Sequence, residues 1–167
     1  IIMTVARLER QKGHHILLEA AEALCREHAN LFFVWVGDGP EGNRLKVAVE
    51  AAGLSERIYF AGSQANVAAW LGQADLFVLP SLAEGMPNAL LEAMAAGVPV
   101  IASAVGGVLD VLTDDGIGMR VPAGDCTALE LSIRRLSAKP DQCHSIGQYG
   151  HNHASQHFNA SAMYSQY

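Results

Sequence analysis

Short apolar runs rich in β-branched residues alternate along this chain with longer segments whose apolar residues recur at helical spacing. This alternation is typical of a parallel sheet covered by helices on both faces, because each buried strand needs a crossover helix before the next strand. We therefore predict an α/β fold, a single Rossmann-like, doubly wound parallel sheet of about six strands. The strands are expected at residues 1–6, 31–36, 57–60, 75–79, 98–102 and 118–121.

The predicted helices fill the segments between these strands and follow the last one. They are expected at 14–28, 41–52, 66–73, 88–96, 107–113 and 125–137. The remaining tail, residues 141–167, is polar and rich in His, Gln and Ser with scattered aromatic residues. We expect this tail to be helical and to pack on the outside of the domain.

The chain has 167 residues, of which 50% are hydrophobic and 17% are charged. This length supports one buried core but is short for two, so residues 1–167 are predicted to form one domain. The first residues, Ile1 and Ile2, follow no initiator Met and no signal sequence. We expect the chain to be part of a longer protein.

The net charge of −6, with 11 Lys and Arg, argues against a nucleic-acid partner. No apolar stretch approaches the roughly 20 residues that cross a bilayer, so no transmembrane segment is predicted. The cysteines are far apart and form no C-x-x-C pair, which argues against a disulfide framework or a zinc site. We expect a cytoplasmic location, with any membrane association made through a part of the protein outside this chain.

The segment 37–42 matches G-x-G-x-x-G, follows a predicted strand and opens a predicted helix. A dinucleotide-binding fingerprint belongs on the first βα turn, whereas here a complete strand and helix precede the motif. The next strand ends at 60–62 without the carboxylate that would bind a ribose. We interpret the segment as a tight strand-to-helix turn near a ligand, and not as an NAD site.

The segment after the fourth predicted strand carries the main candidate site. Pro87 suits the first turn of a helix, so Glu84 is expected in the loop and Glu92 inside the helix. Both carboxylates can accept hydrogen bonds from the hydroxyls of ribose and hexose. Free backbone amides at the positive end of this helix suit a phosphate or sugar oxygen. The residues expected to present these amides are Gly85, Met86, Asn88 and Ala89.

Three cations, Arg7, Arg10 and Lys12, follow the first predicted strand. Ligands of open α/β sheets bind beyond the carboxyl ends of the strands, where this loop and the Glu84 loop are expected to meet. Arg7, whose guanidinium carries several donors in a fork, and Lys12, whose ammonium is a compact charge, would then face a diphosphate. Together with the helix dipole they would stabilise a departing nucleoside diphosphate without needing a metal.

These segments resemble glycosyltransferase family 4 in order and spacing over nearly the whole chain. The motifs that carry the resemblance are V-A-R-L at 5–8 with K-G at 12–13, G-D-G-P at 37–40, A-D-L-F-V-L-P-S at 74–81, E-x7-E from Glu84 to Glu92, P-V-I-A at 99–102 and G-G at 106–107. The family has the GT-B fold, in which two Rossmann-like domains face a cleft. The resemblance implies that this chain is the C-terminal domain, which binds the nucleotide-sugar donor, and that the N-terminal acceptor domain is absent.

The resemblance further implies a retaining transferase that needs no metal or cofactor, with the nucleoside-diphosphate sugar as donor substrate and a glycan, lipid or small molecule as acceptor. In this reading Arg7 and Lys12 bind the donor diphosphate, Glu84 lies near the transferred sugar and Glu92 binds the ribose hydroxyls. The amides of Met86, Asn88 and Ala89 bind sugar and phosphate oxygens, while the loop after Phe60, including Gly62, lies near the base and the Gly37 turn lies close to the ligand. The chain alone is expected to be inactive.

Three positions depart from the family pattern. Ala6 stands where Gly commonly precedes the Arg, Asp110 stands where a Glu often follows the paired glycines, and the turn at 115–118 is one residue short. Two other functions remain open: a GT-B sugar-nucleotide epimerase or phosphorylase, and a non-catalytic nucleotide-binding module. A phosphorylase would need a pyridoxal-binding Lys, for which no signature is found. The presence of Arg7, Lys12 and Glu84 favours an enzyme.

Histidines are the remaining candidates. His14 and His15 follow Lys12 and Gly13 at the start of the first helix, where one of them could face the diphosphate. We expect both to be solvated residues instead. His153 and His157 are four residues apart and could clasp a metal on one helix face, but no third ligand is evident. No metal site is therefore predicted.

Overall fold

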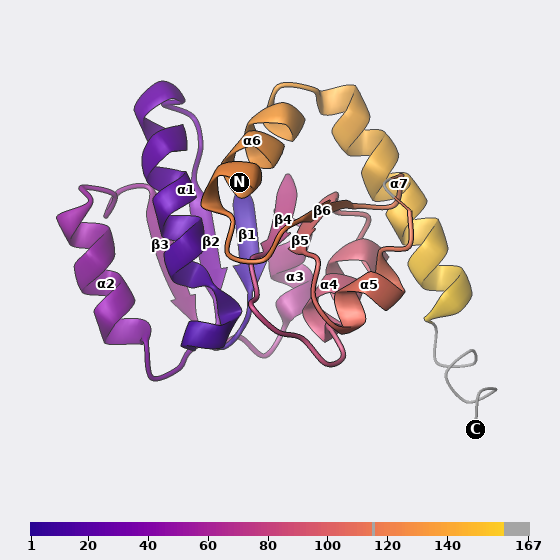
Figure 1. Cartoon of the computed structure of the whole chain (residues 1–167), viewed down its shortest axis with the longest axis horizontal. Coiled ribbons are helices and arrows are strands. Elements are labelled where there is room, and N and C mark those ends of the chain that lie inside the picture. The colour runs from indigo at the N-terminus through magenta and orange to yellow at the C-terminus, as the bar shows by residue number, and fades with distance from the viewer. Residues whose placement is uncertain (115, 159–167) are drawn as a thin grey trace.

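The computed structural model describes residues 1–114 and 116–158 (Figure 1). Asp115, at the start of the shortened turn, and residues 159–167 of the predicted tail lie outside the described residues. Six strands form one sheet. They are β1 (Ile2–Val5), β2 (Phe33–Val36), β3 (Ile58–Gly62), β4 (Leu76–Leu79), β5 (Val100–Ser103) and β6 (Met119–Val121).

The helices alternate with these strands as the sequence predicts. They are α1 (His14–Glu27), α2 (Gly42–Ala51), α3 (Val67–Leu71), α4 (Asn88–Ala95), α5 (Gly107–Val111), α6 (Cys126–Ser137) and α7 (Pro140–His157). A 3₁₀ helix at Arg10–Lys12, η1, was not expected. Pro87 is the N-cap of α4 and not part of its first turn, which differs from the sequence interpretation.

All neighbouring strands are parallel, and their order is β3-β2-β1-β4-β5-β6. The chain moves outward from β1 to β3, then returns through α3 to the other side of β1 and continues to β6. The order of the strands thus reverses between β1 and β4, and an open crevice forms beyond the carboxyl ends of strands at such a point. The doubly wound, Rossmann-like sheet predicted from the sequence is confirmed.

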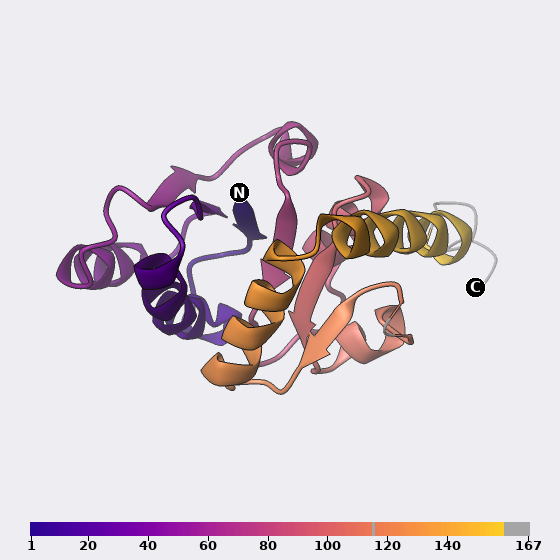
Figure 2. The same cartoon turned by 90° about the horizontal axis from the view of Figure 1, so that it is seen from above.

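Two apolar layers hold the helices on the sheet. Phe33 and Trp35 of β2 project into the first layer, together with residues of α1, α2 and α6. Phe77 and Leu79 of β4 project into the second layer, together with residues of α3, α4, α5 and α7. Figure 2 shows α1 and α2 on one side of the sheet and α3 on the other. The alternating direction of side chains along a strand explains why the inner strands β1, β2, β4 and β5 contribute to both layers.

The described part of the tail is helical, as predicted, and α7 packs against α4. Two glycines allow this close approach, because a β-carbon at Gly147 would lie 2.3 Å from the Gly97 carbonyl oxygen and one at Gly150 would lie 2.9 Å from that of Ile117. His151 contacts the α4 carbonyl oxygen of Ala95 through Nδ1 at 2.7 Å.

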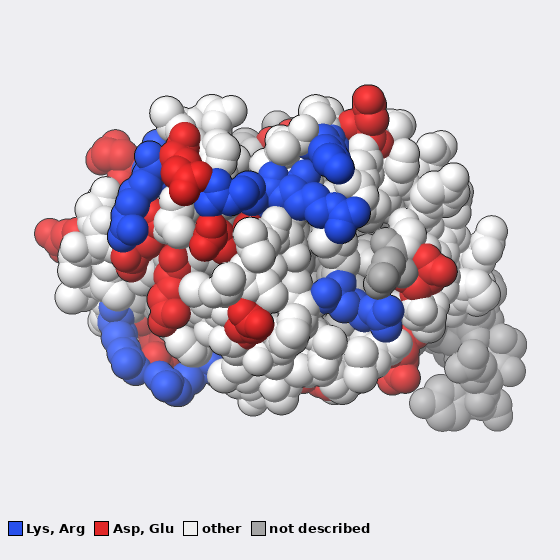
Figure 3. All heavy atoms as spheres, turned by 45° about the horizontal axis from the view of Figure 1, so that its top comes forward, with Lys and Arg blue, Asp and Glu red and all other residues white. Residues whose placement is uncertain are grey.

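The face shown in Figure 3 carries basic and acidic side chains that adjoin one another. Arg26 pairs with Glu22 at 3.5 Å, and Arg134 of α6 pairs with both Glu130 and Glu27, the latter on α1. Arg134 therefore ties two helices of the same layer together. None of the helices in the described residues has both the length and the apolar character of a membrane span.

Candidate functional site

The loops after β1 and β4 are joined to each other at the point where the strand order reverses. The amide of Leu82 donates to the carbonyl of Gln11 at 2.7 Å, and the Gln11 side chain donates to the carbonyl of Ala83 at 3.1 Å. Gly13 packs against Pro80 so tightly that a β-carbon at position 13 would lie 1.9 Å from the Pro80 carbonyl oxygen. The two loops therefore form one surface, as the sequence analysis required.

Lys12, Ser81 and Glu84 form a compact polar cluster on this surface. Lys12 Nζ lies 2.7 Å from Glu84 Oε1, and Ser81 Oγ donates to the same oxygen at 2.6 Å. The side chains of Lys12 and Glu84 are 22% and 6% exposed, and Ser81 is fully buried. Among the described residues Glu84 Oε2 has no hydrogen-bond partner. One carboxylate oxygen is thus held, and the other can accept hydrogen bonds from a ligand.

Arg7 lies on the same loop as Lys12 but outside this cluster. Its side chain is 72% exposed and pairs with Glu9 at 3.0 Å. Both cations assigned to a diphosphate therefore contact a carboxylate in this structure, Arg7 with Glu9 and Lys12 with Glu84. An anionic ligand has to share or displace these contacts.

The start of α4 presents fewer free amides than the sequence indicates. The amide of Asn88 donates to the carbonyl of Met86 at 3.0 Å, so the expectation of a free amide at position 88 is wrong. Among the described residues no backbone acceptor is found for the amides of Gly85, Met86 and Ala89. These three amides at the positive end of α4 can donate to an anion.

Glu92 lies in the second turn of α4 and is exposed. No side-chain hydrogen bond or ion pair involves it within residues 1–114 and 116–158. Its carboxylate is therefore available to hydroxyl donors.

The loop after β5 supports the Glu84 loop from behind. The amide of Gly107 donates to the carbonyl of Glu84 at 3.2 Å, and a β-carbon at Gly106 would lie 1.9 Å from that oxygen. The paired glycines singled out in the sequence thus allow the two backbones to touch.

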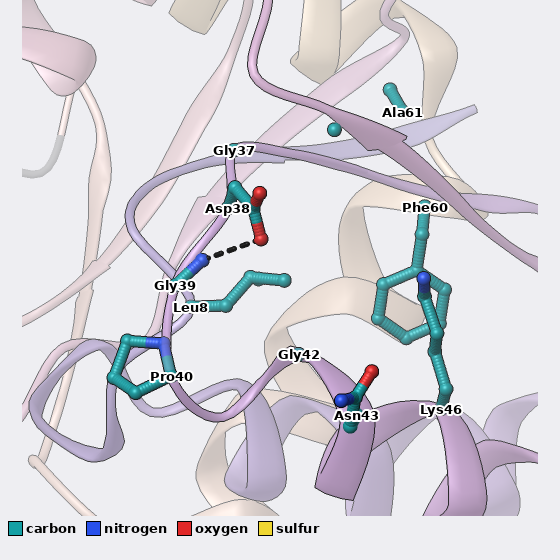
Figure 4. A pocket seen from close by; sticks show the side chains of 11 residues that line it. Leu8, Gly37, Asp38, Gly39, Pro40, Gly42, Asn43, Lys46, Phe60 and Ala61 are labelled. Carbon is teal, nitrogen blue, oxygen red and sulfur yellow. Dashed lines mark hydrogen bonds between the residues drawn. The ribbon is translucent and has the colours of Figure 1, made fainter.

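A pocket of about 440 Å³ adjoins the loop after β1, between the loop after β2, the start of α2 and the end of β3 (Figure 4). It contains the predicted Gly37 and Gly62, but none of Arg7, Lys12 and Glu84. The candidate residues therefore fall into two neighbouring groups. The pocket is lined by Leu8, Gly37, Asp38, Gly39, Pro40, Gly42, Asn43, Lys46, Phe60, Ala61 and Gly62.

The G-x-G-x-x-G segment forms the tight turn that the sequence analysis favoured. Gly37 has φ 135°, and its β-carbon position lies 2.0 Å from the Ala6 carbonyl oxygen. That of Gly39 lies 2.6 Å from the Leu8 carbonyl oxygen. These glycines bring the β2 turn against the loop that carries Arg7 and Lys12.

A column of aromatic rings was not foreseen; His14 and Trp35 in it are buried, and Phe60 lines this pocket. His14 contacts Trp35 edge-to-face at 5.1 Å, Trp35 contacts Phe60 in the same way at 5.1 Å, and Lys46 Nζ lies 5.7 Å from the centre of the Phe60 ring. Figure 4 shows the Phe60 ring and Lys46 at the pocket wall. The register of the sheet decides which aromatic side chains of β2 and β3 meet on one face, and the sequence does not specify this register.

His14 is only 1% exposed, so the expectation that it is a solvated residue at the helix start is wrong. Burial, with smaller contributions from His15 and Lys12, lowers its pKa from 6.5 to about 4. Neither ring nitrogen has a hydrogen-bond partner among the described residues. The neutral ring is therefore a core residue in this structure and does not face a diphosphate.

The two histidines near the end of α7 lie together, with ring centres 4.7 Å apart. Burial and the proximity of His157 lower the pKa of His153. The described residues contain no group of three or more His, Cys, Asp or Glu arranged to hold a metal ion.

The fold and this site define an α/β domain with cations, carboxylates and helix amides on the loops that meet where the strand order reverses. Residues 1–153 match the family model of glycosyl transferases group 1. The chain belongs to this family.

Three relatives illustrate the match. The amylovoran biosynthesis glycosyltransferase AmsK of Erwinia amylovora is 34% identical over 144 residues, covering 81% of this chain and 35% of AmsK. Anabaena HepE, solved in complex with UDP, superimposes with a TM-score of 0.91 at 25% identity, covering 99% of this chain and 46% of HepE. The crystal structure of the C-terminal domain of LpcC, a group 1 glycosyl transferase family protein of Francisella tularensis, has the same fold, with a TM-score of 0.87 at 24% identity, covering 95% of this chain and 86% of that domain.

This chain is thus an enzyme domain of the group 1 glycosyltransferases, with the fold of their C-terminal GT-B domain. It spans 35% of AmsK and 46% of HepE.

Proposed function

We propose that this chain is the donor-binding domain of a retaining glycosyltransferase of family 4, whose N-terminal domain binds a glycan, lipid or small-molecule acceptor. The contact of Lys12 with Glu84 at 2.7 Å carries the proposal. It joins the loops of β1 and β4 at the strand-order reversal, where open α/β sheets bind their ligands. The UDP complex of HepE supports a nucleoside-diphosphate sugar as the ligand class.

In the proposed complex the diphosphate lies at the start of α4. The free amides of Gly85, Met86 and Ala89 donate to its oxygens, and Lys12 and Arg7 supply positive charge. Charge builds on the diphosphate as the bond to the sugar breaks, so these donors stabilise the leaving group. The donor is a substrate, and we propose no cofactor or metal.

The two carboxylates bind the hydroxyls of the donor as hydrogen-bond acceptors. Glu84 Oε2, which has no partner among the described residues, accepts from a hydroxyl of the transferred sugar, and the exposed Glu92 accepts from the ribose. The pocket that contains Gly37 and Gly62 lies on the side of the base. Transfer itself requires the acceptor domain, so this chain alone binds donor without turnover.

The first test is a titration of the chain with UDP, GDP, ADP, their common sugar conjugates and NAD, followed by saturation-transfer NMR. A half-site is expected to bind in the millimolar range, corresponding to about 4 kcal/mol. Arg7→Ala and Glu92→Ala should abolish binding of the preferred nucleoside diphosphate. Arg26→Ala, at a residue of similar side-chain exposure (75% against 72%), and Glu50→Ala at the end of α2 are the matched controls. Binding of NAD alone, or binding indifferent to Arg7 and Glu92, would overturn the proposal.

A further inference from the structure

Ser81 is the buried member of the polar cluster at the end of β4. It has no exposed surface, and its hydroxyl donates to Glu84 Oε1 at 2.6 Å. The sequence motif contains this serine but suggests no role for it. A buried hydroxyl that donates to a carboxylate forms a charge-assisted bond, which is stronger than one between neutral groups.

Ser81 and Lys12 hold the same oxygen but differ in what a ligand does to them. Lys12 is 22% exposed and positively charged, so a bound diphosphate competes with Glu84 for its ammonium group. The Ser81 hydroxyl is neutral and buried, and an anion in the crevice cannot reach it. When the diphosphate draws Lys12 away, Ser81 remains to hold Glu84.

The backbone of Glu84 is already fixed from the other side. Its carbonyl accepts from the amide of Gly107 at 3.2 Å and touches Gly106. The remaining freedom of Glu84 is in its side chain, which the Ser81 bond restricts by occupying Oε1. That bond leaves Oε2 as the oxygen directed to a ligand.

We propose that Ser81 is a positioning residue, which orients the carboxylate of Glu84 toward the donor sugar while Lys12 serves the diphosphate. The proposal rests on the proposed function, because it assumes that Glu84 contacts the sugar. The proposal predicts a selective effect: loss of the Ser81 hydroxyl weakens binding of the sugar but not of the nucleoside diphosphate.

A double-mutant cycle tests this signature. The wild type, Ser81→Ala, Glu84→Gln and the double variant are titrated by NMR with the preferred nucleoside diphosphate and with its sugar conjugate. Ser81→Ala is expected to weaken binding of the sugar conjugate at least about tenfold, the lower end of the range for a hydrogen bond to a charged group, and to leave binding of the diphosphate unchanged. In the Glu84→Gln background the same change is expected to have no further effect. Ser103→Ala, at another buried serine at the end of a strand, controls for the loss of a buried hydroxyl.

The outcomes separate the two proposals. A wild type that binds no nucleoside diphosphate and no sugar conjugate removes the proposed function, and this inference with it. If the wild type binds both and Ser81→Ala weakens both equally, the serine acts on the fold and the inference fails. It fails also if the loss persists beside Glu84→Gln, because Ser81 then does not act through Glu84.

Discussion

Gly107 at the start of α5 lies so close to Gly85 that a β-carbon at position 107 would be 1.8 Å from the Gly85 carbonyl oxygen. The adjacent Gly106 makes a similar approach to the carbonyl of Glu84. The loops after β4 and β5 therefore pack backbone on backbone, an arrangement that only a residue without a side chain permits. This packing places Glu84 and the amides before α4 relative to the sheet.

Gly107→Ala is expected to push these loops apart, because a carbonyl oxygen cannot yield as a flexible side chain can. We expect a loss of about 1–3 kcal/mol in the free energy of unfolding, the range for overpacked sites, measured by chemical denaturation. Donor binding, followed by NMR, should weaken with it. Gly72→Ala is the control, since its β-carbon would have no neighbour closer than 3.6 Å. Unchanged stability and binding in Gly107→Ala would show that the close approach is absent in solution.

Glu9 pairs with Arg7 at 3.0 Å and so competes with any diphosphate that Arg7 binds. We expect Glu9→Gln to tighten nucleoside-diphosphate binding by roughly two- to fivefold at low salt, because an exposed pair contributes at most about 1 kcal/mol. Calorimetric titration measures the change, which should shrink at high ionic strength. Glu22→Gln, which removes the partner of Arg26, should have no effect. Weaker binding in Glu9→Gln would instead assign Glu9 a supporting role.

The sequence was sufficient to predict the fold because parallel strands leave a strong pattern. The inner strands β1, β2, β4 and β5 are largely buried on both faces, and every strand is separated from the next by a helical segment. All six strands therefore appear within two residues of their predicted starts. The packing of α7 was harder to predict. Its buried residues are Ile146, Gly147, Gly150 and Ala154, and this mostly small set in a polar helix gives only a weak apolar stripe.

The site was predicted only as far as residue types and loops allow. Charged residues at the ends of β1 and β4 identify Lys12 and Glu84, because the sheet topology brings those loops together. Ser81 was missed since a single serine after a strand is common, although its place three residues before Glu84 was a usable signal. The separation of Gly37 and Gly62 into a neighbouring pocket depends on side-chain positions, which no pattern of spacing specifies.

His14 should make this domain sensitive to acid. Its pKa is about 4 in the fold, against an ordinary value of 6.5 for a solvated histidine, so the folded state binds fewer protons than the unfolded state between these pH values. The contribution to stability is complete above pH 6.5 and is lost as the pH falls toward 4. The difference corresponds to about 3 kcal/mol.

His14→Phe keeps a ring against Trp35 and removes the titrating group. We expect the free energy of unfolding of the wild type to fall more steeply than that of His14→Phe between pH 6.5 and 4, as measured by urea denaturation at several pH values. His144→Phe, on the exposed side of α7, should follow the wild type. Parallel curves for wild type and His14→Phe would mean that His14 is solvated in solution.

The substitution Gly147→Ala has two opposing effects on the stability of the fold. Alanine favours a helix over glycine by up to about 1 kcal/mol, so Gly147→Ala would stabilise α7 if the helix were free of neighbours. A β-carbon at this position would, however, lie 2.3 Å from the Gly97 carbonyl oxygen, and the helix would have to move away from α4 and β5. Since overpacking costs about 1–3 kcal/mol, we expect a net loss of stability and faster hydrogen exchange in α7. Gln148→Ala, at the exposed neighbouring position, gains helix propensity without the clash and should be neutral or slightly stabilising. A gain in stability for Gly147→Ala would show that α7 does not hold this contact in solution.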